Sequence, residues 1–161
     1  MSERVWYKKW TLWAVVVFAA LFIWGLARVA NAGEVLLGVG AGATNNNDWI
    51  GQMVTLSDRD WYVSVMRVGG DDIQPDTWRF AVGYRVDWRE DKKIAPFLRL
   101  GTAYWVDEPI PLISDHWSYD MSAGVRLWKV VDIEWTHNST AGRTDFNKGN
   151  DMPFVNVVFS F

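Results

Sequence analysis

The amino-acid sequence predicts an all-β fold, an eight-stranded antiparallel transmembrane β-barrel that follows an N-terminal export signal. Three observations predict it. Apolar and polar residues alternate with period two through most of the chain after residue 32, as in strands with one apolar and one polar face. Aromatic residues lie at both ends of the apolar faces, as in the girdles of membrane barrels. Short and long connections alternate along the chain, as turns and external loops do in such barrels.

Residues 1–32 resemble a signal peptide. Basic residues precede an apolar run at 11–27, and the small residues Ala30 and Ala32 then occupy the two positions that a signal peptidase reads. We therefore predict cleavage after Ala32, which leaves 33–161 as the barrel domain. The apolar run is long for a signal peptide, so an uncleaved anchor is the alternative.

Composition limits the function classes. The leader carries four of the 16 basic residues and one of the 19 acidic residues, so the remainder is more acidic than the whole chain, whose net charge is −3. This balance argues against binding to nucleic acid, and the sequence contains no nucleic-acid motif. The chain has no cysteine, which excludes disulfides and thiolate chemistry. Eight of the 12 tryptophans lie after residue 32, and tryptophan favours membrane interfaces.

The clearest strand is Trp78 to Trp88, WRFAVGYRVDW. Its apolar face begins and ends with tryptophan, and its other face carries arginine, aspartate and glycine. Residues 117–127 repeat the pattern. A soluble sandwich would turn its large residues inwards, whereas charges and glycines on one face suit the narrow, packed interior of a small barrel. We therefore assign the apolar faces to lipid.

Counting all such segments gives eight strands, of which the second and third alternate poorly. The predicted strands are 34–43, 49–56, 61–69, 78–88, 94–105, 116–127, 131–140 and 151–161. The even count places both ends of the mature chain in the periplasm. The last strand ends on Phe161 and resembles the C-terminal strand by which the assembly machinery of the bacterial outer membrane recognises its barrels, which makes that machinery an expected partner.

A polar group interrupts the apolar face of the seventh strand. His137 and Ser139 have the parity of Trp135, so both should face lipid at the external end of the strand. The parity of the eighth strand places Asp151 outwards as well, beside them. A histidine can take the proton of a serine nucleophile, and a carboxylate can orient the imidazole. The same three residue types are also ordinary at a wet rim, so type and spacing alone leave both interpretations open.

The stretch HNSTAGRTDFNKGND, residues 137–151, resembles the signature of the lipid A 3-O-deacylases, the PagL family. His137 and Ser139 match the family's base and nucleophile, and Asp151 occupies the position of its acidic residue, a glutamate. The resemblance implies that Gly142 and Asn147 supply oxyanion contacts and that Gly149 keeps the matching spacing. Thr140 replaces the family's asparagine in the substrate-binding stretch, and Asp151 is one methylene shorter than glutamate.

The resemblance implies a serine hydrolase of the outer membrane that removes the 3-O-linked acyl chain of lipid A, the lipid anchor of lipopolysaccharide. The active site would face the outer leaflet, with no metal and no organic cofactor. A non-enzymatic structural or adhesive barrel is the first alternative. An acyltransferase barrel, which passes the acyl group to an acceptor other than water, is the second. The sequence leaves the oligomeric state open, including a homodimer.

Other polar residues have simpler explanations. Asp71, Asp72 and Asp76 could bind a divalent cation but are typical of a solvated loop. His116 is expected next to a loop, and the sequence assigns it no role. Eight strands leave an interior that side chains fill, so the inward charges should neutralise one another; they are Arg79, Arg85, Asp87, Arg99, Asp120, Arg126, Asp132 and Glu134.

Overall fold

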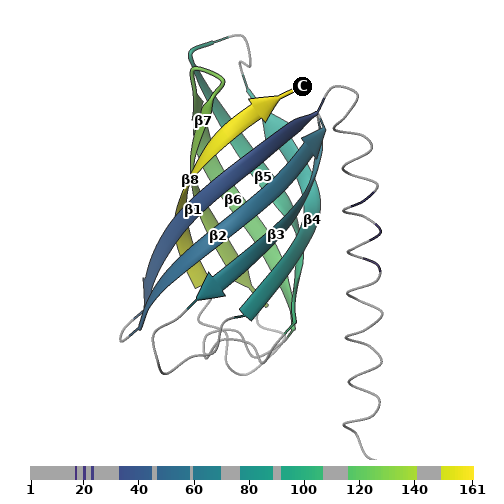
Figure 1. Ribbon diagram of the computed structural model, residues 1–161, viewed down its shortest axis with the longest axis vertical. Helices are drawn as coiled ribbons and strands as arrows, with labels where there is room; N and C mark the ends of the chain where they lie inside the picture. Colours follow the sequence, from purple (N-terminus) through teal and green to yellow (C-terminus); the bar gives the residue numbers. More distant parts are fainter. Residues whose placement is uncertain are drawn as a thin grey trace, which may run out of the picture.

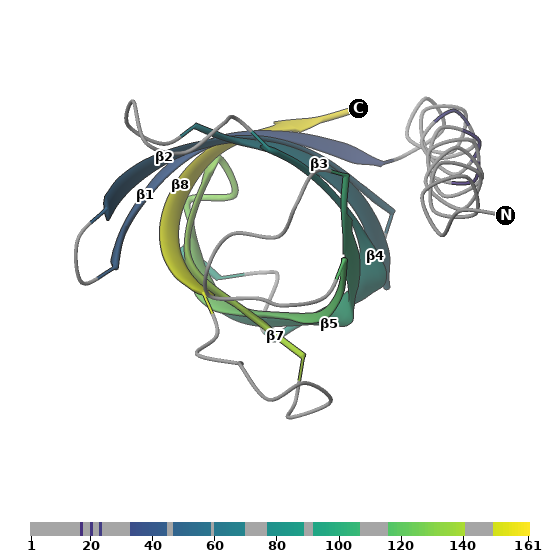
Figure 2. The ribbon, with the colours of Figure 1, turned by 90° about the horizontal axis from the view of Figure 1, so that it is seen from below.

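The computed structural model shows a closed barrel of eight antiparallel strands (Figure 1). The strands are β1 (Glu34–Thr44), β2 (Asn47–Asp58), β3 (Trp61–Gly69), β4 (Thr77–Asp87), β5 (Ile94–Trp105), β6 (Trp117–Leu127), β7 (Val131–Ser139) and β8 (Asn150–Ser160). Each strand pairs with its neighbours in sequence, and β1 pairs with β8. The ring in Figure 2 is therefore complete, and no sheet edge is left open to lipid.

The structure describes residues 17, 20, 23, 33–44, 47–58, 60–69, 77–88, 92–106, 116–140 and 150–161. The predicted leader and its cleavage site lie outside these residues, apart from three positions. Within the described part of the chain, no helix is long and apolar enough to cross a membrane.

All eight predicted strands are present, and every strand end lies within two residues of its predicted position. The largest difference concerns β2, which begins at Asn47 rather than residue 49 because its ladder with β1 continues to the pair Thr44–Asn47. The predicted bounds 34–43 and 49–56 imply a connection over residues 44–48, and this is wrong, since only residues 45 and 46 separate the two strands.

The two ends of the barrel differ in their connections. One end, called the turn end below, joins strands through residues 59–60, 88–93 and 128–130. The opposite end, called the loop end, holds the connections 45–46, 70–76, 106–116 and 140–149. Phe161 donates its backbone N–H to the carbonyl of Gly33 at 3.2 Å, so both ends of the barrel domain meet at the turn end. This agrees with the expected common position of the two ends.

Large apolar side chains face outwards around the barrel. The exposed outward residues include Leu37, Val39, Ile50, Trp78, Tyr84, Val86, Trp88, Leu100, Trp117, Tyr119, Met121, Ile133, Trp135, Val155, Val157 and Phe159. The predicted faces of the fourth, sixth, seventh and eighth strands are confirmed. An apolar exterior with tryptophans near the strand ends is the surface of a barrel that crosses a membrane.

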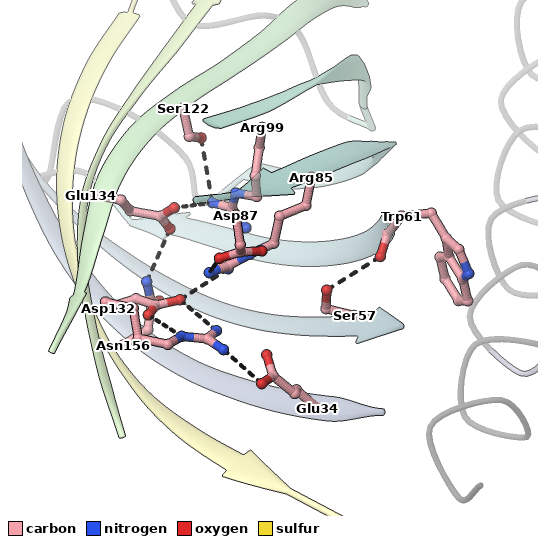
Figure 3. A network of polar contacts seen from close by, with 11 residues as sticks. Glu34, Ser57, Trp61, Arg85, Asp87, Arg99, Ser122, Asp132, Glu134 and Asn156 are labelled. Carbon is pink, nitrogen blue, oxygen red and sulfur yellow. Dashed lines mark hydrogen bonds and ion pairs between the residues drawn. The ribbon is translucent and has the colours of Figure 1, made fainter. Parts of the chain in front are cut away.

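The interior holds paired charges (Figure 3). Arg99 meets Glu134 at 2.5 Å, and Arg85 meets Asp132 at 2.9 Å. Arg79 pairs with Asp120, and Arg126 bridges Glu34 and Asp132. The prediction that the inward charges neutralise one another is confirmed. Low-dielectric surroundings require this pairing, because a buried charge without a partner is strongly unfavourable.

The interior also contains an apolar cluster that the alternation pattern does not reveal. It consists of Met53, Met66, Val68, Trp105, Met152 and Phe154, all buried. Met53 of β2 and Met66 of β3 are direct cross-strand partners in it. Because the inner faces of these strands mix such apolar residues with Thr55, Ser57 and Ser64, their polar–apolar contrast is weak, which explains the poor alternation of the second and third predicted strands.

Candidate active site

A histidine–carboxylate pair lies on the outer surface near the loop end. His137 of β7 and Asp151 of β8 stand directly opposite each other in the antiparallel ladder. Nδ1 of His137 lies 2.8 Å from Oδ1 of Asp151. The side chains keep 35% and 51% of their accessible surface, so a molecule in the surrounding membrane can reach both. This exposure confirms that both side chains face outwards, as the alternation of the sequence predicts.

The carboxylate of Asp151 determines the tautomer of the His137 imidazole. An ionised carboxylate only accepts hydrogen bonds, so Nδ1 of His137 carries the hydrogen that points to Asp151. In the neutral ring, Nε2 is then left as the basic nitrogen. The shorter side chain of aspartate therefore reaches the histidine, and the pair has the polarity that a general base requires.

Trp135 completes the surroundings of the carboxylate. Its indole Nε1–H donates to the same Oδ1 of Asp151 at 3.0 Å. Sequence reasoning placed Trp135 on the outer face but gave it no role at the site. The available signal was its position: it shares a face with His137, and its cross-strand partner is Pro153, so it is a diagonal neighbour of Asp151.

Ser139 continues the same face of β7 beyond His137. The two residues are two positions apart on the strand, about 6.6 Å between backbones, so the imidazole must lean along the strand to meet the hydroxyl. Ser139 has an interaction within the protein. The cross-strand partner of Ser139 is Tyr119, and that of His137 is Met121. The hydroxyl thus adjoins an aromatic and an aliphatic side chain that also face lipid.

A groove of about 280 Å³ opens beside Ser139 on the outer surface. Its lining residues come from β5, β6 and β7, and they are Leu100, Gly101, Tyr119, Asp120, Met121 and Ser139. Among the outward side chains, Leu100, Met121 and the ring of Tyr119 are apolar, and the polar atoms are the hydroxyls of Tyr119 and Ser139. An apolar groove that ends at a hydroxyl suits a hydrocarbon chain whose polar end lies at Ser139.

The remaining predicted site residues divide into two groups. Thr140 is fully buried, which separates its side chain from His137 and Asp151 on the accessible surface. Gly142, Asn147 and Gly149 lie outside the described residues, and so do Asp71, Asp72 and Asp76. Within the part of the chain that the structure describes, no group of three or more histidine or acidic residues could hold a metal ion.

The fold and the accessible His137–Asp151 pair define a transmembrane barrel with a polar group on its lipid-facing wall. No family model and no curated protein matches the chain. Among solved structures, the outer membrane enzyme PagL matches with a TM-score of 0.49 and 15% identity, over 78% of this chain and 99% of that one. Neisserial surface protein A (NspA) matches with a TM-score of 0.45 and 11% identity, over 79% and 94%. Similarity at this level concerns the fold alone.

Proposed function

We propose that the protein is an esterase of the outer membrane that hydrolyses the 3-O-linked acyl chain of lipid A. The observation that carries the proposal is the 2.8 Å contact between His137 and Asp151 on the lipid-facing wall, with Ser139 beside it on the same face. A substrate that reaches this face must come from the membrane, and the loop end is then the external end, in contact with the outer leaflet.

The proposed reaction uses the three side chains in turn. Nε2 of His137 takes the proton of Ser139, whose Oγ attacks the ester carbonyl carbon. The tetrahedral intermediate collapses, the bond to the sugar oxygen breaks, and His137 returns the proton to that oxygen. Asp151 stabilises the imidazolium in both steps. His137 then takes a proton from water, whose oxygen attacks the carbonyl carbon of the acyl–serine. The bond from that carbon to Oγ of Ser139 breaks, His137 returns the proton to Oγ, and the fatty acid leaves.

The sequence signature supplies the proposed oxyanion contacts, and the structure supplies the proposed site for the acyl chain. The backbone N–H of Gly142 and the amide of Asn147 are proposed to donate hydrogen bonds to the oxyanion. Removal of one such donor lowers kcat about 100- to 1000-fold in comparable enzymes. The groove beside Ser139, lined by Leu100, Tyr119 and Met121, is proposed to hold the acyl chain that is removed.

Mass spectrometry of lipid A tests the proposal. Cells that make the protein should contain lipid A lacking one 3-O-linked chain, and cells that make Ser139→Ala should not. Thr102→Ala is the matched control, because it removes another exposed hydroxyl from the outer wall, on β5, and should leave the deacylation intact. Unchanged lipid A in cells with the unaltered protein would favour a non-enzymatic barrel, and a gained chain would favour an acyltransferase.

A further inference from the structure

A second polar group faces lipid on another wall of the barrel. Of the arginines and lysines within the described strands, Arg67 alone has the outward parity; the side chains of Arg79, Arg85 and Arg99 are buried inside, and Arg126 bonds to interior carboxylates. Arg67 is exposed. A cation on the lipid face is unfavourable near the bilayer centre and tolerated only near the interface.

The residues around Arg67 indicate how deep in the bilayer it lies. It lies two residues before the last residue of β3, at the loop end. Its direct cross-strand partner on β4 is Trp78, the second residue of that strand. Because tryptophan on a barrel exterior belongs to the interfacial girdle, Arg67 lies at the level of the lipid headgroups.

Arg67 borders a groove of about 270 Å³ on β1, β2, β3 and β4. Two cross-strand rows form its wall. The row nearer the loop end runs from Val39 through Gln52 to Arg67. The row below it, nearer the turn end, contains Leu37, Val54 and Val65 and is entirely aliphatic. The groove is therefore polar at headgroup level and apolar below, and its polar end carries hydrogen-bond donors and a positive charge.

This arrangement matches one class of molecule. A guanidinium and a primary amide both donate hydrogen bonds, and arginine binds phosphate oxygens in a two-pronged geometry. Arg67 also has an interaction within the protein, but its guanidinium carries five donors. We propose that this surface, the Arg67 groove, binds a lipid of the surrounding leaflet whose phosphate headgroup has a net negative charge. The phosphate lies against Arg67 and Gln52, and an acyl chain lies along Leu37, Val54 and Val65.

The Arg67 groove is distinct from the candidate active site. In the closed strand order, β3 and β7 are four strands apart in either direction, so Arg67 and His137 lie on opposite walls. The proposal does not depend on esterase activity. Its consequence is that one wall holds a phosphorylated lipid while the other remains accessible to a second lipid molecule.

Quenching of tryptophan fluorescence tests the Arg67 groove. The full barrel is placed in phosphatidylcholine vesicles that contain the same fraction of either phosphatidic acid or phosphatidylcholine with brominated acyl chains. Trp78 lines the groove. Its fluorescence is obtained by subtracting the fluorescence of the Trp78→Phe variant from that of the unaltered protein. Phosphatidic acid should occupy the site about fivefold more strongly than phosphatidylcholine, the ratio expected from ~1 kcal/mol for one interfacial cation. Equal quenching by the two lipids would overturn the proposal.

Three variants and one competitor test whether the charge of Arg67 causes this preference, which is measured as the ratio of quenching by phosphatidic acid to quenching by phosphatidylcholine. Arg67→Gln should bring the ratio close to one, and Arg67→Lys, which keeps the charge, should retain a ratio above that of Arg67→Gln. Lys129→Gln removes an exposed charge at the turn end and should leave the ratio unchanged. A ratio that survives in Arg67→Gln, or falls equally in Lys129→Gln, contradicts the proposal. So does relief of the quenching by dissolved inorganic phosphate, which would indicate a site for a free anion.

Discussion

Asp151 accepts two hydrogen bonds at one oxygen, from His137 Nδ1 at 2.8 Å and from Trp135 Nε1 at 3.0 Å. All three side chains face lipid, where an ionised carboxylate is stable only if its partners replace lost water. The two donors come from one strand and the carboxylate from the next. The hydrogen bonds among Trp135, His137 and Asp151 therefore connect β7 to β8 on the outer surface.

The first prediction concerns the charge of Asp151. Asp151→Asn keeps the size of the side chain but removes the charge that stabilises the imidazolium, so kcat should fall about 100- to 10,000-fold. Deacylation of lipid A by purified protein in detergent measures it. Asp151→Glu is the control, because it keeps the charge and should retain more activity than Asp151→Asn. Equal activity of the asparagine variant and the parent would exclude a role for this carboxylate.

The second prediction concerns Trp135 as a positioning residue. Trp135→Phe keeps an aromatic ring in the interfacial girdle but removes the Nε1–H that holds Asp151. A loss of ~1 kcal/mol for one hydrogen bond corresponds to a fall in kcat of about fivefold. KM should stay constant, since the indole acts on the carboxylate rather than on substrate. Trp88→Phe, at a tryptophan 50% exposed at the turn end, should change neither constant.

The third prediction concerns the groove beside Ser139. Leu100 lines the part of the groove on β5, two strands away from the hydroxyl on β7. Leu100→Trp should fill this part, and overpacking of about 1–3 kcal/mol lowers kcat/KM for long-chain esters roughly 5- to 150-fold. Short-chain esters should be hydrolysed as before. A series of nitrophenyl esters of increasing chain length measures the difference, and a uniform loss for all lengths would argue against the groove as the acyl site.

The sequence predicts the strands and the outward direction of His137, Ser139 and Asp151 because both follow from period two. It does not predict the Trp135–Asp151 contact, which depends on how two distant strands align. The two outer grooves depend on the register of at least three strands each. The interior cluster around Met53 and Met66 cannot be predicted for another reason. Where both faces of a strand carry apolar residues, polar and apolar residues no longer alternate, and the inward face cannot be identified from the sequence.

The fourth prediction concerns the interior pair Arg99–Glu134. Both side chains are almost fully buried, at 2% and 0% exposure. Glu134→Gln leaves the guanidinium of Arg99 without its neutralising carboxylate, so the free energy of unfolding should fall by about 3–5 kcal/mol. Denaturant unfolding in lipid vesicles measures it. Glu34→Gln is the matched control, because the carboxylate of Glu34 is 28% exposed and the loss should be about 1 kcal/mol or less.

The fifth prediction concerns the turn between β6 and β7. Trp128 and Lys129 have positive φ values of 49° and 65°, and the N–H of Val130 donates to the carbonyl of Leu127 at 3.0 Å. This is the backbone of a tight hairpin turn that favours glycine or asparagine, and a side chain in this conformation costs about 1–2 kcal/mol. Lys129→Gly should therefore raise the free energy of unfolding by roughly 1 kcal/mol. Lys129→Ala keeps the Cβ atom and should give no such gain in the same unfolding experiment; equal stabilisation by both variants would mean that loss of the charge, rather than relief of the backbone, is responsible.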